Sequence, residues 1–333
     1  MSSSNTPSRS KTERRKLSEL LANLRGTNEY LVPLVVLLII VAGTSLVAPK
    51  ILSTSALVGF LVNAAPIVML VVGGTFPILL GSIDLSVAGI VSLAGVLVVD
   101  FTPVLGIWTV PAVLALSLVA GALQGFLQSF AQVPSFVITL GSLGVFSGLS
   151  LLLSGGAAQP MPSNDAVISF FARSTAGVPN SIITVTVVVF LLAGIMHFTR
   201  FGREVLACGA EERAAAMSGV KIIVIRMFAF AISAVCAALG GMLLLSMTMF
   251  SSPTLAGNIL LLSVVGVVLG GTAISGGVGG LVSGVVGGLI TAWLRVITVL
   301  LGLPPTSQNI VFGVVALIAV GLTTDRSKIG VIK

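Results

Sequence analysis

The stretch IITVTVVVFLLA, from Ile182 to Ala193, carries no charge and shows no sustained alternation of polar with apolar residues. LVPLVVLLIIV, from Leu31 to Val41, has the same character. In lipid, backbone groups must be paired within their own segment or in a closed barrel, and barrel strands alternate in polarity over about ten residues. Both stretches therefore predict membrane-spanning helices.

The composition of the whole chain agrees with this prediction. Of its 333 residues, 56% are hydrophobic and 8% are charged, whereas a soluble domain has roughly 25% charged residues. The two cysteines, Cys208 and Cys236, are too few for a disulfide framework and lack metal-ligand spacing, so we interpret them as ordinary small residues. About thirty polar and charged residues precede the first apolar run, unlike a signal peptide, and we expect the first span to be retained.

Turn and charge signals divide the apolar sequence into about ten segments of spanning length. These are residues 31–48, 55–80, 84–102, 105–130, 135–154, 180–198, 224–248, 257–272, 276–300 and 308–323. With the N-terminus inside, this order places 14 of the 17 basic residues on the cytoplasmic side. Only Lys50, Arg173 and Arg295 fall outside or near the outer end, so the positive-inside rule favours an even number of spans.

We therefore expect an all-α, polytopic transmembrane helix bundle of about ten spans with both termini in the cytoplasm. Residues 1–29 form a cytoplasmic tail, in which the spacing of Leu17, Leu20, Leu21 and Leu24 fits either a short helix on the membrane surface or a solvated lead-in. Residues 30–323 form the transmembrane domain, and residues 324–333 a second cytoplasmic tail. The connection 155–179 is rich in Gly and Pro and is predicted to be an exposed outer loop.

Four glycines fall at every fourth position of one predicted helix, which leaves a face where another backbone can approach closely. They are Gly276, Gly280, Gly284 and Gly288. Packing within one subunit, a subunit interface and a transport pathway all remain compatible with this spacing.

Asp84 lies between two apolar stretches, where a carboxylate at the bilayer centre costs about 2.5 to 3.5 kcal/mol. Such a residue either faces a polar cavity or caps a helix, and Asp84 could cap the span that begins near Leu85. The two roles can coexist.

Several classes of chemistry find no support in the sequence. A proton-coupled carrier needs a chain of intramembrane ionisable groups, and Asp84 is accompanied only by Asp100, His197 and Arg295 near the ends of spans. No phosphate-binding loop, catalytic dyad or metal-ligand cluster is present, so we expect neither an enzyme nor a resident cofactor or metal.

The inner loop 199–221 has charged edges and a centre rich in helix formers. Residues 211–217 predict a short helix, with acidic residues at its positive end and Gly219 as its terminator. Its alanines and Met217 would present a low apolar surface suited to a groove on a partner. A purely structural inner loop is the alternative interpretation.

At this loop the chain resembles the ribose/sugar-type permease subunits of bacterial ATP-binding-cassette importers. The resemblance rests on Phe201-Gly202-Arg203 and on AAAMSGV at residues 214–220. It extends to GSIDLSV at 81–87, PSFVITLG at 134–141 and LGGTAISGG at 269–277. These motifs occur in matching order across roughly residues 30–323.

The resemblance implies a multi-pass permease of the bacterial cytoplasmic membrane that moves a sugar or sugar-like solute. It implies a second permease subunit, two cytoplasmic ATPase domains and an extracytoplasmic solute-binding protein, and no nucleic acid. It assigns ATPase coupling to Phe201, Gly202, Arg203, Glu211, Glu212, Arg213, Ala214, Ala215, Ala216, Met217, Ser218 and Gly219. Candidates for the translocation path or for structural roles are Asp84, Ser86, Phe136, Thr139, Thr272 and Ser275.

The chain departs from the family pattern at two places. Residues 258–263 replace an acidic stretch, which weakens any assignment to ribose in particular, and Glu211 stands where an Asn is common. An importer for an amino acid or signalling molecule is one alternative. An ion-coupled carrier or passive channel that works without ATPases is another.

Overall fold

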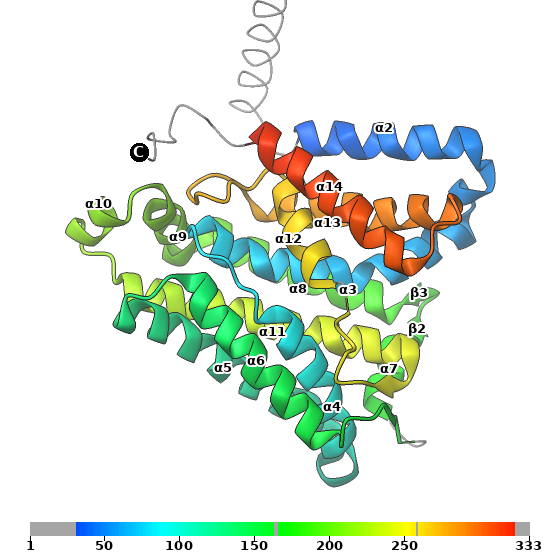
Figure 1. Cartoon of the computed structure of the whole chain (residues 1–333), viewed down its shortest axis with the longest axis horizontal. Helices are drawn as coiled ribbons and strands as arrows, with labels where there is room; N and C mark the ends of the chain where they lie inside the picture. Colours follow the sequence, from blue (N-terminus) through cyan, green and yellow to red (C-terminus); the bar gives the residue numbers. More distant parts are fainter. Residues whose placement is uncertain (1–30, 163–165, 258, 324–333) are drawn as a thin grey trace, which may run out of the picture.

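A computed structural model describes residues 31–162, 166–257 and 259–323, and shows a bundle of α-helices (Figure 1). The tails predicted over residues 1–29 and 324–333 lie outside the described residues. The helices are α2 (Leu31–Val47), α3 (Thr54–Leu79), α4 (Val87–Leu105), α5 (Thr109–Ala131), α6 (Ser135–Leu153), α7 (Ala166–Ala172), α8 (Asn180–Phe198), α9 (Arg200–Ala210), α10 (Glu212–Met217), α11 (Ile222–Thr248), α12 (Ile259–Leu269), α13 (Leu281–Leu300) and α14 (Pro305–Thr323).

Short elements complete the described chain. Two 3₁₀ turns, η1 (Pro49–Leu52) and η2 (Gly106–Trp108), join α2 to α3 and α4 to α5. Strand β1 (Gln159–Pro160) pairs antiparallel with β4 (Phe250–Ser251), and β2 (Ser174–Thr175) pairs with β3 (Val178–Pro179). The strands are only two residues long, so the prediction of an all-α fold is confirmed.

Helices α3 and α11 form the centre of the bundle. The second half of α3 and most of α11 are buried, and the two helices pack against each other. Helices α5 and α4 cover one side of this pair and α6 packs on α4, whereas α13 packs on α3 and carries α2 and α12. Helix α14 packs on α12, so the outer layers in Figure 1 are α5 and α6 below and α2 and α14 above.

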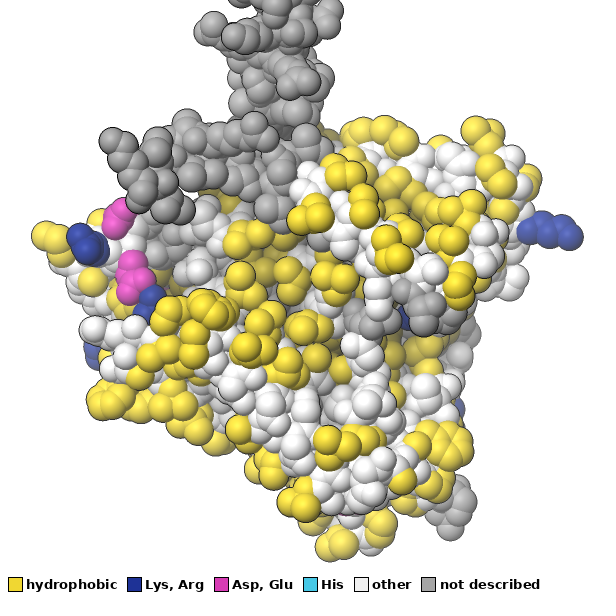
Figure 2. Space-filling model, viewed as in Figure 1, with side chains coloured by type: hydrophobic (Ala, Val, Ile, Leu, Met, Phe, Trp, Pro, Cys, Tyr) yellow, Lys and Arg dark blue, Asp and Glu magenta, His cyan; other side chains and the backbone are white. Residues whose placement is uncertain are grey.

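On the face shown in Figure 2 hydrophobic side chains are spread across the bundle, and many large hydrophobic residues of the outer helices are exposed, as lipid requires. Six segments have the length and composition to cross a membrane, if Val87–Ala131, which contains α4, η2 and α5, is counted as one. The others are Thr54–Leu79, Ser135–Leu153, Asn180–Phe198, Ile222–Thr248 and Leu281–Leu300. Helices α2 and α12 are apolar but shorter.

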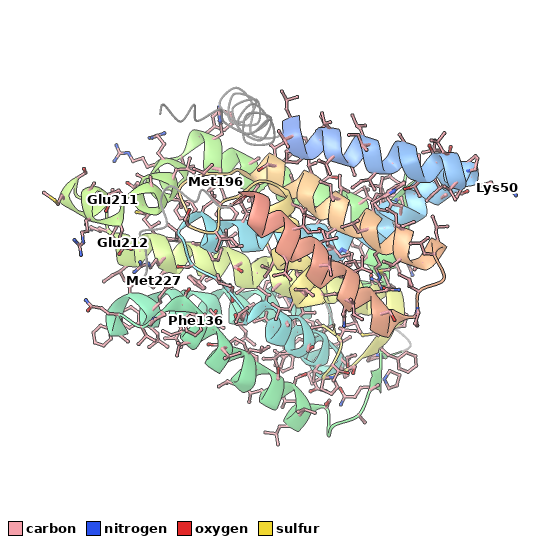
Figure 3. All side chains as sticks on the ribbon, turned by 45° about the horizontal axis from the view of Figure 1, so that its top comes forward. Lys50, Phe136, Met196, Glu211, Glu212 and Met227 are labelled. Atoms are coloured by element: carbon pink, nitrogen blue, oxygen red, sulfur yellow. The ribbon has the colours of Figure 1, made fainter. Side chains whose placement is uncertain are left out.

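The connections between helices gather at two opposite ends, which we name the α10 end and the η1 end. At the η1 end, the β1–β4 pair joins the connection after α6 to the connection after α11. At the α10 end, the Gly277 N–H donates to Leu79 O at 2.9 Å, which joins the connection after α12 to the end of α3. Glu211 and Lys50 mark the two ends in Figure 3.

The predicted helix 276–300 is wrong at its start, because α13 begins at Leu281. Gly276, Gly277 and Gly279 have φ values of +84°, +74° and +132°, which no helix contains. Gly280 is the N-cap of α13, so only Gly284 and Gly288 of the four spaced glycines lie within the helix. There they do allow close approach, because a Cβ on Gly284 or Gly288 would press on Thr75 or Val68 of α3.

The connection 155–179 is exposed over most of its described residues, as predicted, but it also contains a helix with buried side chains. This helix is α7, in which Ile168 is fully buried and Phe171 is 8% exposed. Because α7 packs on α11 and α8, it closes this end of the bundle instead of forming a free loop.

Candidate functional site

The candidate site is the surface formed by α9 and α10 together with the segments beneath them. Helix α9 follows α8 after a tight turn at Thr199, and Gly202 permits this turn because a Cβ there would overlap the Met196 carbonyl. Glu211, in an extended conformation, separates α9 from α10. The predicted short helix over residues 211–217 is confirmed as α10, and Gly219, with a φ of +86°, follows its end.

Helix α10 projects from the bundle at the far left of Figure 1. The side chain of Met217 is 90% exposed, and Ala214 and Ala216 are exposed beside it. Ala215, expected on the same surface, is instead 5% exposed. It faces inward because a six-residue helix cannot turn every side chain outward. The exposed apolar surface of α10 is therefore Ala214, Ala216 and Met217.

Charged residues frame this apolar surface. Arg203, Glu211 and Arg213 are exposed, and Glu212 forms an ion pair with Arg226 at the start of α11. It is the only ion pair among the described residues. It links α10 directly to one of the two central helices.

Helix α9 packs on the bundle through side chains, such as Phe201 against Phe76 and Phe228, and at Gly209 it meets backbone directly. A Cβ on Gly209 would overlap Leu79 O and would stand 2.5 Å from Gly277 N. On the same surface, Gly81 approaches Ser275 O, with 3.1 Å from an ideal Cβ to that oxygen. Gly81 has a φ of +69°, a conformation that favours glycine. The contacts bring α9, the segment after α3 and the glycine-rich connection before α13 together without intervening side chains.

The non-helical segment from Gly81 to Ser86, which we name the hub, lies beneath α9 and connects α3 to α4. Its backbone is held by α6, since Ile83 N–H donates to Ser135 Oγ at 3.0 Å and Thr139 Oγ1 donates to Ile83 O at 3.1 Å. Helix α5 holds the hub as well, through a 2.9 Å hydrogen bond from Gln128 Nε2 to Ser82 Oγ.

Asp84 holds the hub to the centre of the bundle. Its Oδ1 accepts hydrogen bonds from the N–H and Oγ of Ser86, at 3.0 and 2.6 Å, and its Oδ2 accepts one from Ser233 Oγ of α11 at 2.7 Å. Ser86 Oγ also lies 3.2 Å from Gln124 Oε1 of α5. Asp84 is only 5% exposed, and these hydrogen bonds from protein donors satisfy its carboxylate.

The prediction that Asp84 is the N-cap of the following helix is wrong, because another residue holds that position. Helix α4 begins at Val87 with Ser86 as its N-cap, so Asp84 lies two residues earlier. It bonds the Ser86 N–H as a turn-forming aspartate does, and its second oxygen remains free to reach α11.

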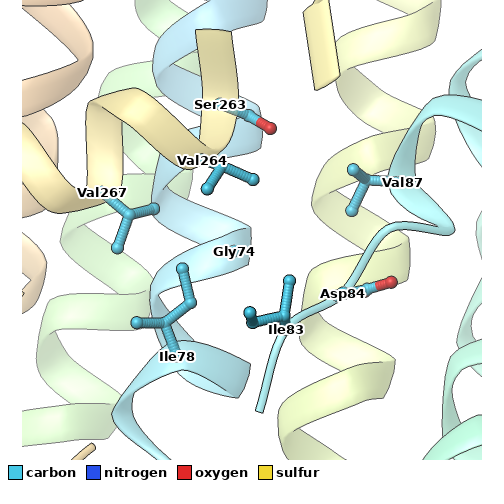
Figure 4. Close-up of a pocket in the computed structure, with 8 residues that line it drawn as sticks. All are labelled: Gly74, Ile78, Ile83, Asp84, Val87, Ser263, Val264 and Val267. Carbon is cyan, nitrogen blue, oxygen red and sulfur yellow. The ribbon is translucent and has the colours of Figure 1, made fainter. Parts of the chain in front are cut away.

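Asp84 lines a cavity that is small and mainly apolar (Figure 4). Its volume is about 10 Å³, enough for roughly one water molecule. The Asp84 carboxylate points away from the Ile83 and Val267 side chains, toward α11. The geometry therefore favours a structural link over direct contact with a solute.

The remaining predicted residues are divided between the hub and the surface. Ser86 and Thr139 belong to the hub contacts described above. Thr272 is buried beside Gly279, and its Oγ1 has no hydrogen-bond partner among the described residues. Ser275 is exposed near Gly81, whereas the side chain of Phe136, labelled in Figure 3, is 52% exposed on α6.

Sequence reasoning missed five residues of the hub contacts. Gln124 and Gln128 are four residues apart in an otherwise apolar helix, a pattern that could have indicated a polar face. Ser82 and Ser135 lie within the quoted motifs GSIDLSV and PSFVITLG but were not singled out there. Ser233 is a single serine in α11, and serines are common in membrane helices.

Comparison with known proteins identifies the family. The family described as branched-chain amino acid transport system / permease component matches residues 56–320. The ribose import permease protein RbsC of Bacillus subtilis is 32% identical over 96% of this chain and 99% of its own length. RbsC of Escherichia coli K12 is 29% identical over 86% of this chain and 91% of its own length.

A relative with a different named solute is also similar. The autoinducer 2 import system permease protein LsrC of Yersinia pseudotuberculosis is 29% identical over 77% of this chain and 73% of its own length. No solved structure matches the chain. Because the family match covers most of the sequence, this chain belongs to the permease components of the branched-chain amino acid transport system family.

Proposed function

We propose that this chain is the membrane-spanning subunit of an ATP-binding-cassette importer for a sugar or sugar-like solute. A separate subunit hydrolyses ATP. The names of the relatives support the solute class, since two are ribose import permeases and one imports autoinducer 2. The exposed α10, with Met217 at its tip and with α9 packed on the end of α3 and on the connection before α13, is the observation that carries the proposal.

The chain crosses the bacterial cytoplasmic membrane ten times, through α2–α6, α8 and α11–α14, with both termini inside. The clustering of the connections at two ends supports this order, because the loops assigned to one side by ten spans also meet in space. The α10 end is cytoplasmic. Its exposed Arg200, Arg203, Arg213 and Lys221 agree with the positive-inside rule.

The ATPase subunit binds α10 in a groove. Ala214, Ala216 and Met217 supply the apolar contact, and the charged residues around them set its orientation. The permease works as a dimer with a second copy or a related subunit, two ATPase domains and an extracytoplasmic solute-binding protein. Membership of the permease family supports the ATPase and the binding protein as partners.

The hub transmits movement of α10 to the transmembrane helices. Displacement of α9 pushes on the backbone of Leu79 and Gly277, and the hub in turn is bonded to α5, α6 and α11. Since these contacts are backbone or buried hydrogen bonds, α9 cannot move independently of them. ATP binding then shifts the population between outward- and inward-facing states by differential binding to the two.

The test is reconstitution of the chain with its cognate ATPase and binding protein. Met217→Asp should abolish co-purification of the ATPase and lower ATP-driven uptake by at least roughly tenfold, because a charge in an apolar contact is left unpaired. Met249→Asp is the matched control, since Met249 is 40% exposed at the opposite end, and it should retain the ATPase. Uptake by the chain alone, driven only by a solute or ion gradient, would overturn the proposal.

A further inference from the structure

A second, larger cavity lies between α3 and α13 toward the η1 end, far from the hub. Its volume is about 440 Å³, within the range of small-molecule sites. Most of its wall is apolar, with Phe60, Ile67 and Val299 among the lining residues, and Ile51 of η1 lines it as well. Trp293 is fixed in this wall, since its Nε1 donates to Thr44 Oγ1 at 3.1 Å and its ring packs edge-on against Phe60.

Two polar side chains, Arg295 and Asn63, also line this cavity. The Arg295 side chain is exposed and forms no ion pair with any residue that the structure describes. Asn63 Nδ2 donates one hydrogen to Gly59 O at 2.8 Å and keeps a second. Ionisable residues within spanning helices are costly and mark functional sites by default.

The polar groups lie at different depths. Arg295 precedes the end of α13 by five residues, or about 7 Å, and Asn63 follows the start of α3 by nine residues, or about 13 Å. Ile67 lies about 6 Å deeper again. From the η1 end inward, the cavity therefore presents a cation, then an amide donor, then an apolar wall.

This order matches an anionic phospholipid, which carries a phosphate, then ester carbonyls, then acyl chains. We propose that the cavity is a binding site for the headgroup and glyceryl region of an anionic phospholipid. The Arg295 guanidinium donates two parallel, charge-assisted hydrogen bonds to the phosphate, and the free Asn63 N–H donates to an ester carbonyl. The acyl chains continue along the apolar wall toward Ile67.

The charge balance favours this ligand over a neutral solute. A sugar would not neutralise Arg295, whereas a phosphate supplies the counter-charge that the described residues lack. Attraction of about 1 kcal/mol for a single basic residue near an anionic lipid corresponds to a preference of roughly fivefold. The site lies beside the transmembrane helices, where phospholipid is always available.

Tryptophan quenching tests the site directly, because the chain has only two tryptophans. In a Trp108→Phe background, Trp293 alone reports on the cavity. The full chain is placed in phosphatidylcholine nanodiscs that contain a low fraction of brominated phosphatidylglycerol or brominated phosphatidylcholine. We expect brominated phosphatidylglycerol to quench Trp293 roughly fivefold more effectively.

The variants separate a specific site from bulk lipid. Arg295→Gln should remove the headgroup preference, and Arg295→Lys should keep part of it. Arg173→Gln, which removes an exposed arginine from the connection after α7 at the same end, should leave the preference unchanged. Trp293→Phe, with Trp108 retained, should show equal quenching by both lipids.

Three results would overturn the proposal. Equal quenching of Trp293 by both lipids shows that no anionic site exists. Displacement of the brominated lipid by soluble glycerol 3-phosphate shows a site for free phosphomonoesters. Displacement by ribose assigns the cavity to a solute path.

Discussion

Asp84 joins three elements through one carboxylate, because its two oxygens accept from the hub itself and from α11, and Ser86 extends the link toward α5. Asp84→Asn replaces one accepting oxygen with an amide that donates, and so removes at least one charge-assisted bond. We expect a loss of about 1–3 kcal/mol in stability. The measurement is the apparent melting temperature of the detergent-solubilised chain.

Asp100→Asn provides the matched control for this substitution. Asp100 is half-buried in α4 toward the η1 end, and no described residue forms a hydrogen bond with its carboxylate. The control should melt within a degree or so of the unsubstituted chain. If the Asp84→Asn variant had the same melting temperature as the Asp100→Asn control, the stability of the hub would not depend on the Asp84 carboxylate.

Cys208 yields a prediction on reactivity and pH. It lies in α9, outside the spanning helices, and burial raises the pKa of its thiol, with the negative charge of Glu212 acting in the same direction. A raised pKa means less thiolate at neutral pH, so maleimide labelling should be slow at pH 7 and should increase as the pH rises. Met217→Cys in a Cys208→Ser background should react at least roughly tenfold faster at pH 7, since that position is exposed. Equal rates would contradict the burial of Cys208.

At the residue scale, the sequence identified Asp84 and its neighbour Ser86, but not the distant partners Ser233 and Gln124. The energetic cost of a carboxylate among apolar residues is visible without any structure. Ser233, however, is 149 residues away along the chain, and nothing in its local sequence distinguishes it from other serines of α11. The long-range half of the hub contacts therefore depends on helix packing that a single sequence does not specify.

At the element scale, helices α5 and α11 approach each other closely at two glycines of α5. A Cβ on Gly125 would stand 2.5 Å from Arg226 O, and one on Gly121 would overlap Phe230 O. We expect Gly125→Ala to destabilise the chain by about 2 kcal/mol or more, because one backbone must move away from the other. Thermal unfolding monitored by size-exclusion chromatography measures this effect.

Gly43→Ala tests whether steric overlap is the cause. Gly43 lies in α2 with nothing within 4 Å of an added Cβ. Alanine there should be neutral or should stabilise the helix by up to about 1 kcal/mol, since alanine has the higher helix propensity. If both substitutions lower the melting temperature equally, close packing at Gly125 is not the reason.

The lengths of elements were predictable where apolar runs end in turn signals. The predicted spans 55–80, 135–154 and 180–198 differ from α3, α6 and α8 by one residue at most at either end. The start of α13 was not predictable from glycine spacing, because the same GxxxG pattern occurs in helices and in turns. Only the positive φ of Gly276 and its neighbours, imposed by contact with Leu79 and Gly209, distinguishes the two.

At the scale of the whole molecule, charge and packing lead to the same topology independently. Charge alone favoured ten spans, since with the N-terminus inside an odd number would put the basic residues after the last span on the outer side. The structure adds that α9, the hub and the connection before α13 meet at one end, and that β1 meets β4 at the other. An odd number of crossings between Leu79 and Gly277, or between β1 and β4, would place the two partners of that contact on opposite sides of the membrane.

Cysteine labelling in intact cells tests the arrangement of the whole chain. In a background with Cys208 and Cys236 changed to serine, we expect Lys50→Cys and Thr175→Cys to react with a membrane-impermeant maleimide from outside, because both positions are exposed at the η1 end. Ala216→Cys and Lys221→Cys, exposed at the α10 end, should react only after the membrane is permeabilised. Each pair is the control for the other, because labelling of both pairs after permeabilisation shows that all four variants are expressed and have reactive thiols. Labelling of Ala216→Cys in intact cells would place α10 outside, where no ATPase can reach it, and would contradict both the topology and the proposed importer.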